Sequence, residues 1–196
     1  MARKQGVKRK PARLAPTRSP AHTPAHELTV SREELLVGGS DREFRALIHD
    51  ALAFTSRLEA VRDGYAKMIG VTGIQYTMLV CISVLGASQS VTVKAVAEHL
   101  KLSGPFVTVE VGKLVSMGLV EKAGDPSDRR KVSLSLTDEA RARLAELAPT
   151  QRQVNDVHFG TLTKSDFLAL RRMMGELVES TDNALALLNY LSTGAD

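Results

Sequence analysis

The chain of 196 residues lacks tryptophan, contains a single cysteine, and has only 4% aromatic residues. One cysteine excludes an internal disulfide framework and suits a reducing compartment. The longest apolar run, Met78–Leu85, is far shorter than the roughly 20 residues that span a bilayer. The charged N-terminus has no apolar segment of the kind found in secretory signals. These absences predict a cytoplasmic protein that makes no contact with a membrane.

Acidic residues are absent from residues 1–26, which hold seven lysines and arginines and four of the seven prolines. This segment has few apolar side chains to offset the entropy of ordering, and its prolines oppose a helix. We therefore expect residues 1–39 to form a basic, proline-rich, flexible arm. Its role stays open between a solubilising tail, a mispredicted start codon and an arm that contacts DNA backbone or minor groove. Organelle transit fits less well, because the prolines spoil the amphipathic helix that it needs.

Residues 27–196 hold 19 basic and 22 acidic residues, and the chain is 43% hydrophobic, so this part can bury a core of its own. Apolar residues at helical spacing predict a long helix over about 41–68. A second helix, over about 72–85, is apolar on nearly all sides and is expected at the centre of the core. Two more helices are expected over about 137–159, bent at its proline, and about 164–191.

Capping residues mark the expected starts of these helices. Ser40 and Glu43 have the spacing of a capping box, and Ser31 and Glu34 repeat it before a short element at 32–37. Threonines stand at the expected starts of four further helices, at Thr72, Thr92, Thr137 and Thr163.

The middle of the chain, residues 91–137, has a different pattern. It predicts a short helix over 93–100, a tight turn over 101–103, a second helix over 104–117, and strands over 119–123 and 132–136. The loop between the strands ends in Arg129, Arg130 and Lys131. Taken alone, three cations in a loop are most simply interpreted as a solvated surface with no function. The complete order of helix, turn, helix, strand, basic loop and strand instead indicates a winged helix-turn-helix, whose second helix can enter a major groove about 12 Å wide.

The stretch from Gly118 to Thr137 resembles a signature of the MarR (multiple antibiotic resistance regulator) family. It is similar to the pattern GLV-x-R/K followed by D-x-R-x(5)-L-T, with Asp128, Arg130, Leu136 and Thr137 at the matching positions. The resemblance covers roughly residues 41–190. It implies a homodimer whose N- and C-terminal helices form the interface, and a transcriptional regulator, usually a repressor, that a small ligand releases from DNA. We expect the Asp128 carboxylate to orient the Arg130 guanidinium for DNA.

The second helix of the motif departs from the common family pattern. Val107, Val111 and Leu114 form its expected buried ridge, whereas many relatives carry Ser-Arg where this chain has Thr108 and Val109. An arginine reads guanine by two hydrogen bonds, but Val109 contacts only a thymine methyl or a sugar. We hypothesise that this helix supplies little charge and that affinity depends on the wing, with the N-terminal arm as a further candidate contact. The candidate DNA-binding residues are Ser103, Pro105, Thr108, Val109, Lys113, Asp128, Arg129, Arg130 and Lys131.

Glu110 lies at the edge of the expected buried ridge of the same helix. Two interpretations stay open for its carboxylate. It forms an ion pair with Lys113, three residues further on, or it accepts a hydrogen bond from a cytosine amino group.

Candidate ligand-binding residues lie on the long first helix and at the start of the second. Arg62 follows Phe44 by five helical turns and therefore points along the apolar stripe, where a cation needs an anion. That anion is either an Asp or Glu across a dimer interface or the carboxylate of an effector. Related proteins bind aromatic acids between the dimerisation helices and the DNA-binding lobe. Tyr65, Met68 and Tyr76 complete the candidate site, although each aromatic side chain also suits the core.

Other chemistry finds little support in the sequence. Cys81 lies on an apolar helix, where a thiol is usually inert. The five histidines form no zinc-ligand pattern, and no cofactor or metal is expected. No phosphate-binding glycine loop, nucleophile elbow or metal motif indicates an enzyme. The remaining alternatives are a redox- or metal-responsive regulator of the same fold and an architectural DNA-binding protein without an effector.

The fold class expected is mainly α with a small β-hairpin wing, a winged helix-turn-helix between N- and C-terminal helical dimerisation regions. The expected divisions are the arm at 1–39, dimerisation and core helices at 40–90, the DNA-binding lobe at 91–137 and dimerisation helices at 138–196. The function expected is a cytoplasmic homodimeric repressor that binds a pseudo-palindromic, double-stranded operator. Its expected effector is a small aromatic carboxylate or its CoA thioester, by analogy with the family.

Overall fold

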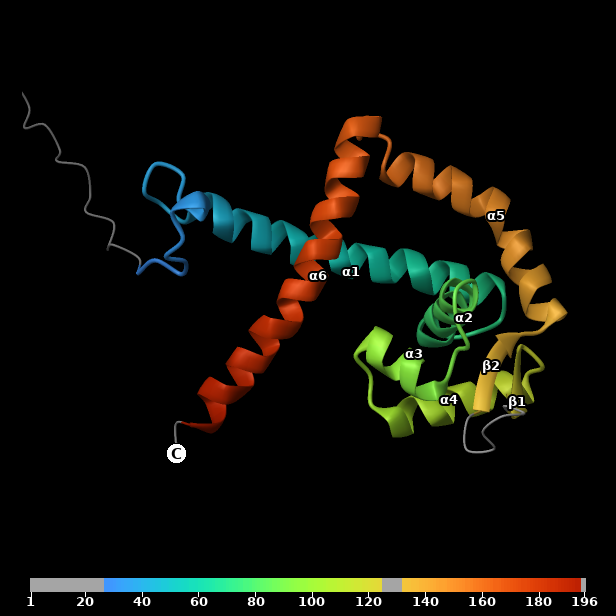
Figure 1. The fold of residues 1–196 in the computed structure, drawn as a ribbon. Helices are drawn as coiled ribbons and strands as arrows, with labels where there is room; N and C mark the ends of the chain where they lie inside the picture. The colour runs from blue at the N-terminus through green and yellow to red at the C-terminus, as the bar shows by residue number, and fades with distance from the viewer. Residues whose placement is uncertain (1–26, 125–131, 195–196) are drawn as a thin grey trace, which may run out of the picture. The chain divides into compact units, whose positions relative to one another are not determined.

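The computed structural model describes residues 27–124 and 132–194 (Figure 1). Within these ranges the chain is mainly helical, with one antiparallel pair of strands, as the sequence predicts. The elements are the 3-10 helix η1 (Glu33–Leu35), helices α1 (Arg42–Met68), α2 (Gly73–Gly86), α3 (Val93–Leu100) and α4 (Gly104–Ser116), strands β1 (Val120–Gly124) and β2 (Val132–Leu136), and helices α5 (Asp138–His158) and α6 (Lys164–Thr193). Two compact units divide the chain, Met1–Phe54 and Thr55–Asp196.

The first unit holds the segment before α1 through the carboxylate of Asp41. Its Oδ2 accepts hydrogen bonds from the backbone N and Oγ1 of Thr29, at 2.8 and 2.7 Å, and from Nε of Arg45 at 2.9 Å. Arg45 also donates from Nη2 to the carbonyl oxygen of Glu27 at 2.9 Å. The backbone N–H of Thr29, followed by the Arg45 guanidinium, holds the pKa of Asp41 far below its ordinary value. Residues 27–41 are thus tied to the first turn of α1.

Both capping boxes predicted in this unit are wrong. Ser40 Oγ accepts from the backbone N of Arg42 at 3.2 Å, only two residues ahead, and Asp41 provides the bonds to the preceding segment instead. Arg32, rather than Ser31, precedes η1, and its side chain caps no backbone N–H. Long-range bonds to Thr29 decide the start of α1, and short-range spacing does not encode them.

Helix α2 is the centre of the core in the second unit, as its apolar composition predicts. Met78, Leu79 and Ile82 are almost completely buried, and the helix packs on α3, α4 and β2. Thr72 and Gln75 form a complete capping box at its start. Cys81 is buried, and this burial raises the pKa of its thiol, which keeps the thiol protonated and unreactive.

The other threonine caps are also confirmed. Thr92, Thr137 and Thr163 each accept a hydrogen bond from the backbone N–H three residues ahead, at the starts of α3, α5 and α6. Helix α5 runs unbroken through Pro149 and changes direction along its length in Figure 1. Local sequence therefore determines where these helices begin.

The hairpin packs on the core through one face of β2. Leu134 and Leu136 are buried, whereas the serines between them point outward, as the alternation predicts. Strand β1 pairs with β2 from Val120 opposite Leu136 to Gly124 opposite Val132, so it begins one residue later than expected. The backbone N of Leu134 also donates to the carbonyl oxygen of Val91 at 2.7 Å, which joins the hairpin to the segment before α3.

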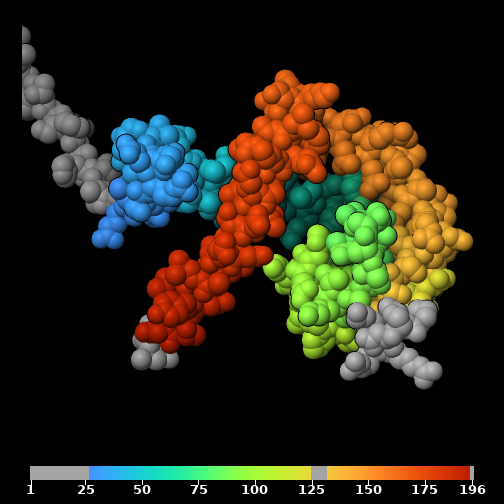
Figure 2. Space-filling model, viewed as in Figure 1, coloured from blue at the N-terminus to red at the C-terminus, as the bar shows by residue number. Residues whose placement is uncertain are grey.

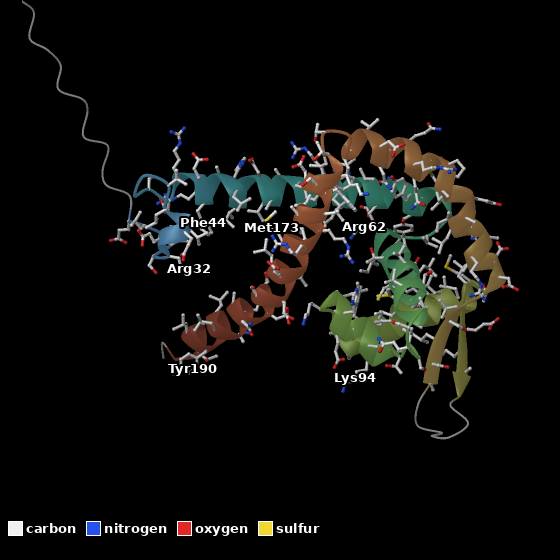
Figure 3. The ribbon with its side chains drawn as sticks, turned by 45° about the horizontal axis from the view of Figure 1, so that its top comes forward. Arg32, Phe44, Arg62, Lys94, Met173 and Tyr190 are labelled. Carbon is white, nitrogen blue, oxygen red and sulfur yellow. The ribbon has the colours of Figure 1, made fainter. Side chains whose placement is uncertain are left out.

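Long helices α1 and α6 carry apolar side chains on their surfaces. Helix α6 has no buried residue along its whole length, on which Met173 and Tyr190 are labelled in Figure 3. No helix in the described ranges is by itself long and apolar enough to cross a membrane, and only α1 with α2, across a bent break, meets that test as a pair. Large exposed apolar residues include Leu47, Ile48, Leu52 and Leu58 on α1, and Leu168, Met173, Met174, Leu177, Val178, Leu185, Leu187, Leu188, Tyr190 and Leu191 on α6.

Candidate nucleic-acid interface

Helices α3 and α4 are joined by a tight turn of three residues. Lys101 adopts a left-handed conformation, with φ of 53°, and its backbone N–H bonds to the carbonyl oxygens of Ala97 and Glu98. This conformation costs a non-glycine residue roughly 1 kcal/mol. Ser103 then caps α4, since its Oγ accepts from the backbone N of Phe106 at 3.4 Å, and Pro105 lies in the first helical turn. The turn therefore ends one helix and starts the next within three residues.

The inner face of α4 is anchored in the core. Val107, Val111 and Leu114 are each 0% exposed, which confirms the predicted buried ridge. The opposite face is open, and we use the term outer face for Pro105, Phe106, Thr108, Val109, Gly112, Lys113 and Ser116. Figure 2 shows part of the α3 and α4 pair, in green, at the surface of the molecule. A rigid helix that presents an open face is what insertion into a groove requires.

Glu110 is a buried link between α4 and α2. Only 7% of the residue is exposed, and its Oε1 accepts from Nζ of Lys113 at 2.6 Å. Its Oε2 accepts from Nε2 of Gln75 at 3.0 Å, while Oε1 of Gln75 accepts from the backbone N of Thr72 at 3.1 Å. The pairing with Lys113 is the first of the two interpretations of Glu110. The Gln75 contact is not predicted, although the capping-box spacing of Thr72 and Gln75 places that amide at the start of α2.

The ion pair determines the protonation of Glu110. The hydrogen bond from Lys113 lowers the pKa of the carboxyl, burial opposes this, and the bond from Gln75 lowers it further. A carboxyl whose pKa is lower in the folded state stabilises the fold above its ordinary pKa. That stabilisation is lost as the pH falls through the lowered value.

Replacing Glu110 with alanine is expected to destabilise the protein by about 2 kcal/mol, because the buried amide of Gln75 loses its acceptor. Chemical denaturation at pH 7 and at progressively lower pH measures this, and the difference between the variant and the native chain should shrink in acid. The matched control is Glu121→Ala, on the exposed part of β1. Equal stability of the two variants at pH 7 would contradict the role of the buried link.

Arg62 pairs with a carboxylate of its own chain, and not with the two anions expected, an Asp or Glu across a dimer interface or the carboxylate of an effector. Its Nε and Nη2 donate to Oδ1 of the neighbouring Asp63 at 3.2 and 3.0 Å. A methyl group added at Gly73 would collide with this Asp63 oxygen, so the carboxylate lies directly against the start of α2. Adjacent residues on a helix do not face each other, and the contact arises because both side chains turn towards α2.

Tyr65 and Tyr76 lie together, whereas Met68 is exposed. The two rings are tilted by 53°, with centroids 6.1 Å apart. Tyr65 donates its hydroxyl to Oδ1 of Asn155 at 3.3 Å, and Gln151 donates from Nε2 to the hydroxyl of Tyr76 at 2.8 Å. Burial raises the pKa of both phenols. Helix α5 thus contributes two amides, four residues apart, that no sequence pattern indicates.

Four of the candidate DNA-binding residues, Asp128, Arg129, Arg130 and Lys131, lie outside the described residues. The described ends of the hairpin, Gly124 and Val132, are paired with each other. In the ranges that the structure covers, no group of three or more His, Cys, Asp or Glu side chains is arranged to hold a metal ion.

Two helices joined by a tight turn, an open second helix and an antiparallel hairpin define a winged helix-turn-helix protein. The family model described as "MarR family" matches residues 69–131. The chain is 30% identical over 114 residues to the HTH-type transcriptional repressor NicR of Pseudomonas putida, an alignment that covers 58% of this chain and 70% of NicR. The HTH-type transcriptional repressor MdtR of Bacillus subtilis is 25% identical over 113 residues, with 58% and 71% covered.

A solved structure shares the fold. The M. tuberculosis transcriptional regulator MOSR, in complex with DNA, is 20% identical and has a TM-score of 0.55, with 70% of this chain and 96% of that chain covered. The chain belongs to the MarR family. It is a transcriptional regulator of the repressor type, and the expectation that it is not an enzyme is confirmed by these relatives.

Proposed function

We propose that the chain is a repressor that binds a pseudo-palindromic DNA operator as a homodimer and leaves it when a small aromatic acid or its CoA thioester binds. The observation that carries the DNA-binding part is the open outer face of α4, held rigidly by a completely buried inner ridge. NicR and MdtR, whose names identify them as repressors, and MOSR, solved with DNA, support it.

In this proposal α4 enters the major groove and residues 125–131 reach the neighbouring backbone. Ser103, Pro105, Thr108, Val109 and Lys113 face the groove from α4. Arg129, Arg130 and Lys131 supply the cations of the wing, and Asp128 orients Arg130. Lys94, which projects from α3 in Figure 3 and is largely exposed, adds a phosphate contact next to α4.

The homodimer is proposed from the apolar faces of α1 and α6. A helix of 30 residues that buries none of them leaves an apolar surface that water-soluble monomers rarely carry. A second copy of the chain is the partner that the MarR family membership supports. A two-fold axis would then place two α4 helices on half-sites about one helical turn apart. Residues 40–90 and 138–196 would supply the dimerisation helices around the lobe at 91–137.

The effector is proposed to bind beside Arg62, Tyr65, Met68 and Tyr76, between the dimerisation helices and the lobe. Its carboxylate would compete with Asp63 for the Arg62 guanidinium, which is 30% exposed. A ligand that prefers a dimer with a different spacing of the two α4 helices releases DNA. A thermal-shift screen with aromatic acids and acyl-CoA thioesters, against an Arg62→Ala variant, tests this site. The buried, protonated Cys81 argues against the redox alternative.

If the chain binds an operator, the full-length protein should enrich one sequence from a pool of randomised duplexes. Replacing Arg130 with alanine should weaken binding of the enriched duplex about tenfold and leave the dimer intact, because one oriented guanidinium is lost from the wing. Electrophoretic mobility shift measures the affinity. The matched control is Arg152→Ala, on the exposed side of α5. Failure to enrich any sequence would overturn the operator proposal, and an unchanged affinity of the Arg130 variant would overturn the wing contact.

A further inference from the structure

The outer face of α4 lacks arginine, asparagine and glutamine, three of the side chains that make paired hydrogen bonds to bases. The helix Gly104–Ser116 contains no arginine, asparagine or glutamine. Arginine or lysine reads guanine, and asparagine or glutamine reads adenine, through two bonds each, which leaves Lys113 as the one side chain of this face with that chemistry.

The two hydroxyl groups of this face donate to the helix itself. Thr108 Oγ1 donates to the carbonyl oxygen of Gly104 at 2.9 Å, and Ser116 Oγ donates to that of Lys113 at 2.8 Å. Each hydroxyl has one hydrogen, which is therefore already used inside the helix. The methyl group of Thr108 remains as an apolar contact on an exposed residue.

The single cation of the outer face is held to one side. Nζ of Lys113 bonds to Oε1 of Glu110, whose other oxygen is fixed by the buried amide of Gln75. This arrangement draws the ammonium towards the inner edge of the helix. From there Lys113 suits a phosphate at the rim of a groove better than a base at its floor.

Two apolar side chains are exposed on the same face. Val109 is 56% exposed and Phe106 is 41% exposed, whereas the three residues of the inner ridge are fully buried. Phe106 is absent from the candidate residues predicted from the sequence. Among the base edges of the major groove, the C5 methyl of thymine is the apolar group, and alanine, threonine methyl and phenylalanine are its usual contacts.

Gly112, on the same face, favours a close approach of DNA to the backbone of α4. It lies in the middle of α4, where glycine costs about 1 kcal/mol relative to alanine, and a methyl group added there would meet no atom within 4 Å. Packing inside the protein therefore does not explain why this position has no side chain. Close approach of DNA to the helix beside Val109 explains it.

We infer that α4 selects its operator through thymine methyl groups, with Val109 and Phe106 as specificity-determining residues and the Thr108 methyl beside them. The inference rests on the proposed DNA-binding function and names what that face reads. Each half-site then carries thymines where the outer face of α4 meets the floor of the groove. Base discrimination arises from apolar contact, and affinity from the cations around it.

The test uses the duplex enriched by the full-length protein from a randomised pool. It is synthesised again with uracil in place of one thymine at a time, which removes the C5 methyl and leaves base pairing intact. At one or more positions in each half-site, affinity should fall roughly fourfold per methyl. Uracil placed outside the protected region is the control. The Val109→Ala variant, which keeps one methyl group, should discriminate thymine from uracil less than the native chain does at the position that Val109 contacts, and Phe106→Ala should do the same at its own position.

The outcomes separate this inference from the proposed function. If no uracil substitution changes the affinity for the enriched duplex, the thymine readout is overturned and the DNA-binding proposal stands. Failure to enrich any duplex overturns the proposed function itself. Undiminished discrimination by both alanine variants, with thermal unfolding midpoints like that of the native chain, overturns the assignment to Val109 and Phe106. Weaker discrimination by either variant at one position supports it.

Discussion

A glutamate in place of Val109 is expected to reduce binding of operator DNA by about 100-fold or more. The side chain is exposed on the outer face of α4, so a longer, charged residue fits without disturbing the core. In the proposed complex the carboxylate would lie among phosphates and beside base edges, where like-charge repulsion costs roughly 3 kcal/mol. Mobility shift at two salt concentrations measures the loss, which should be partly relieved at higher salt.

The matched control for this change is Val84→Glu. Val84 is a similarly exposed valine on a different helix, α2, and the substitution alters charge and size identically. Circular dichroism and thermal unfolding should show that both variants are folded. If Val109→Glu binds DNA like the native chain, then α4 is not the element that enters the groove, whatever the affinity of the control.

An aspartate in place of Leu177 is expected to convert the proposed dimer into a monomer at micromolar concentration. Leu177 is exposed on the apolar stripe of α6. In a two-fold symmetric interface each substitution occurs twice, so two uncompensated carboxylates are buried together. The dimer dissociation constant should rise by about 1000-fold. Sedimentation equilibrium of the native chain and the variant measures it, and operator affinity should fall in parallel because the two α4 helices are no longer joined.

Asn183→Asp supplies the control, since it adds the same charge on α6 about a third of a turn round the helix from Leu177. It should leave the association constant nearly unchanged. A native chain that sediments as a monomer would show that α6 is covered by something other than a second copy. A variant that remains as strongly dimeric as the native chain would show that Leu177 lies outside the interface.

The local starts of the helices could be predicted from the sequence, and the long-range anchors could not. Four threonine caps were predictable because a cap acts over three residues. The capping box predicted at Ser40 is wrong because Asp41, which bonds to Thr29 twelve residues away, stands directly before α1. Before η1 the carboxylate of Glu34 instead accepts from Nε of Arg32. Spacing rules contain no information on which distant backbone group reaches a given carboxylate.

The buried and open faces of α4 were also predictable, because they follow from spacing along a single helix. Val107, Val111 and Leu114 follow helical spacing, so the buried ridge, and with it the opposite face, can be read from the sequence. Phe106 was missed because it lies at the edge of the outer face, nearest the buried ridge, where the degree of burial depends on neighbours rather than on periodicity. Its 41% exposure is decided by what packs against α4.

The helical periods and the order of elements by themselves determined the class of fold, and the signature between Gly118 and Thr137 determined the family resemblance. These properties depend on local propensity and on spacing along the chain. The tertiary structure alone decided the partners of the charged groups: Asp63 for Arg62, Gln75 and Lys113 for Glu110, and Thr29 with Arg45 for Asp41. The exposed valine of α4 can be read from the sequence, but only the packing of α4 against α2 shows that Lys113 bonds to a carboxylate that Gln75 of α2 also holds.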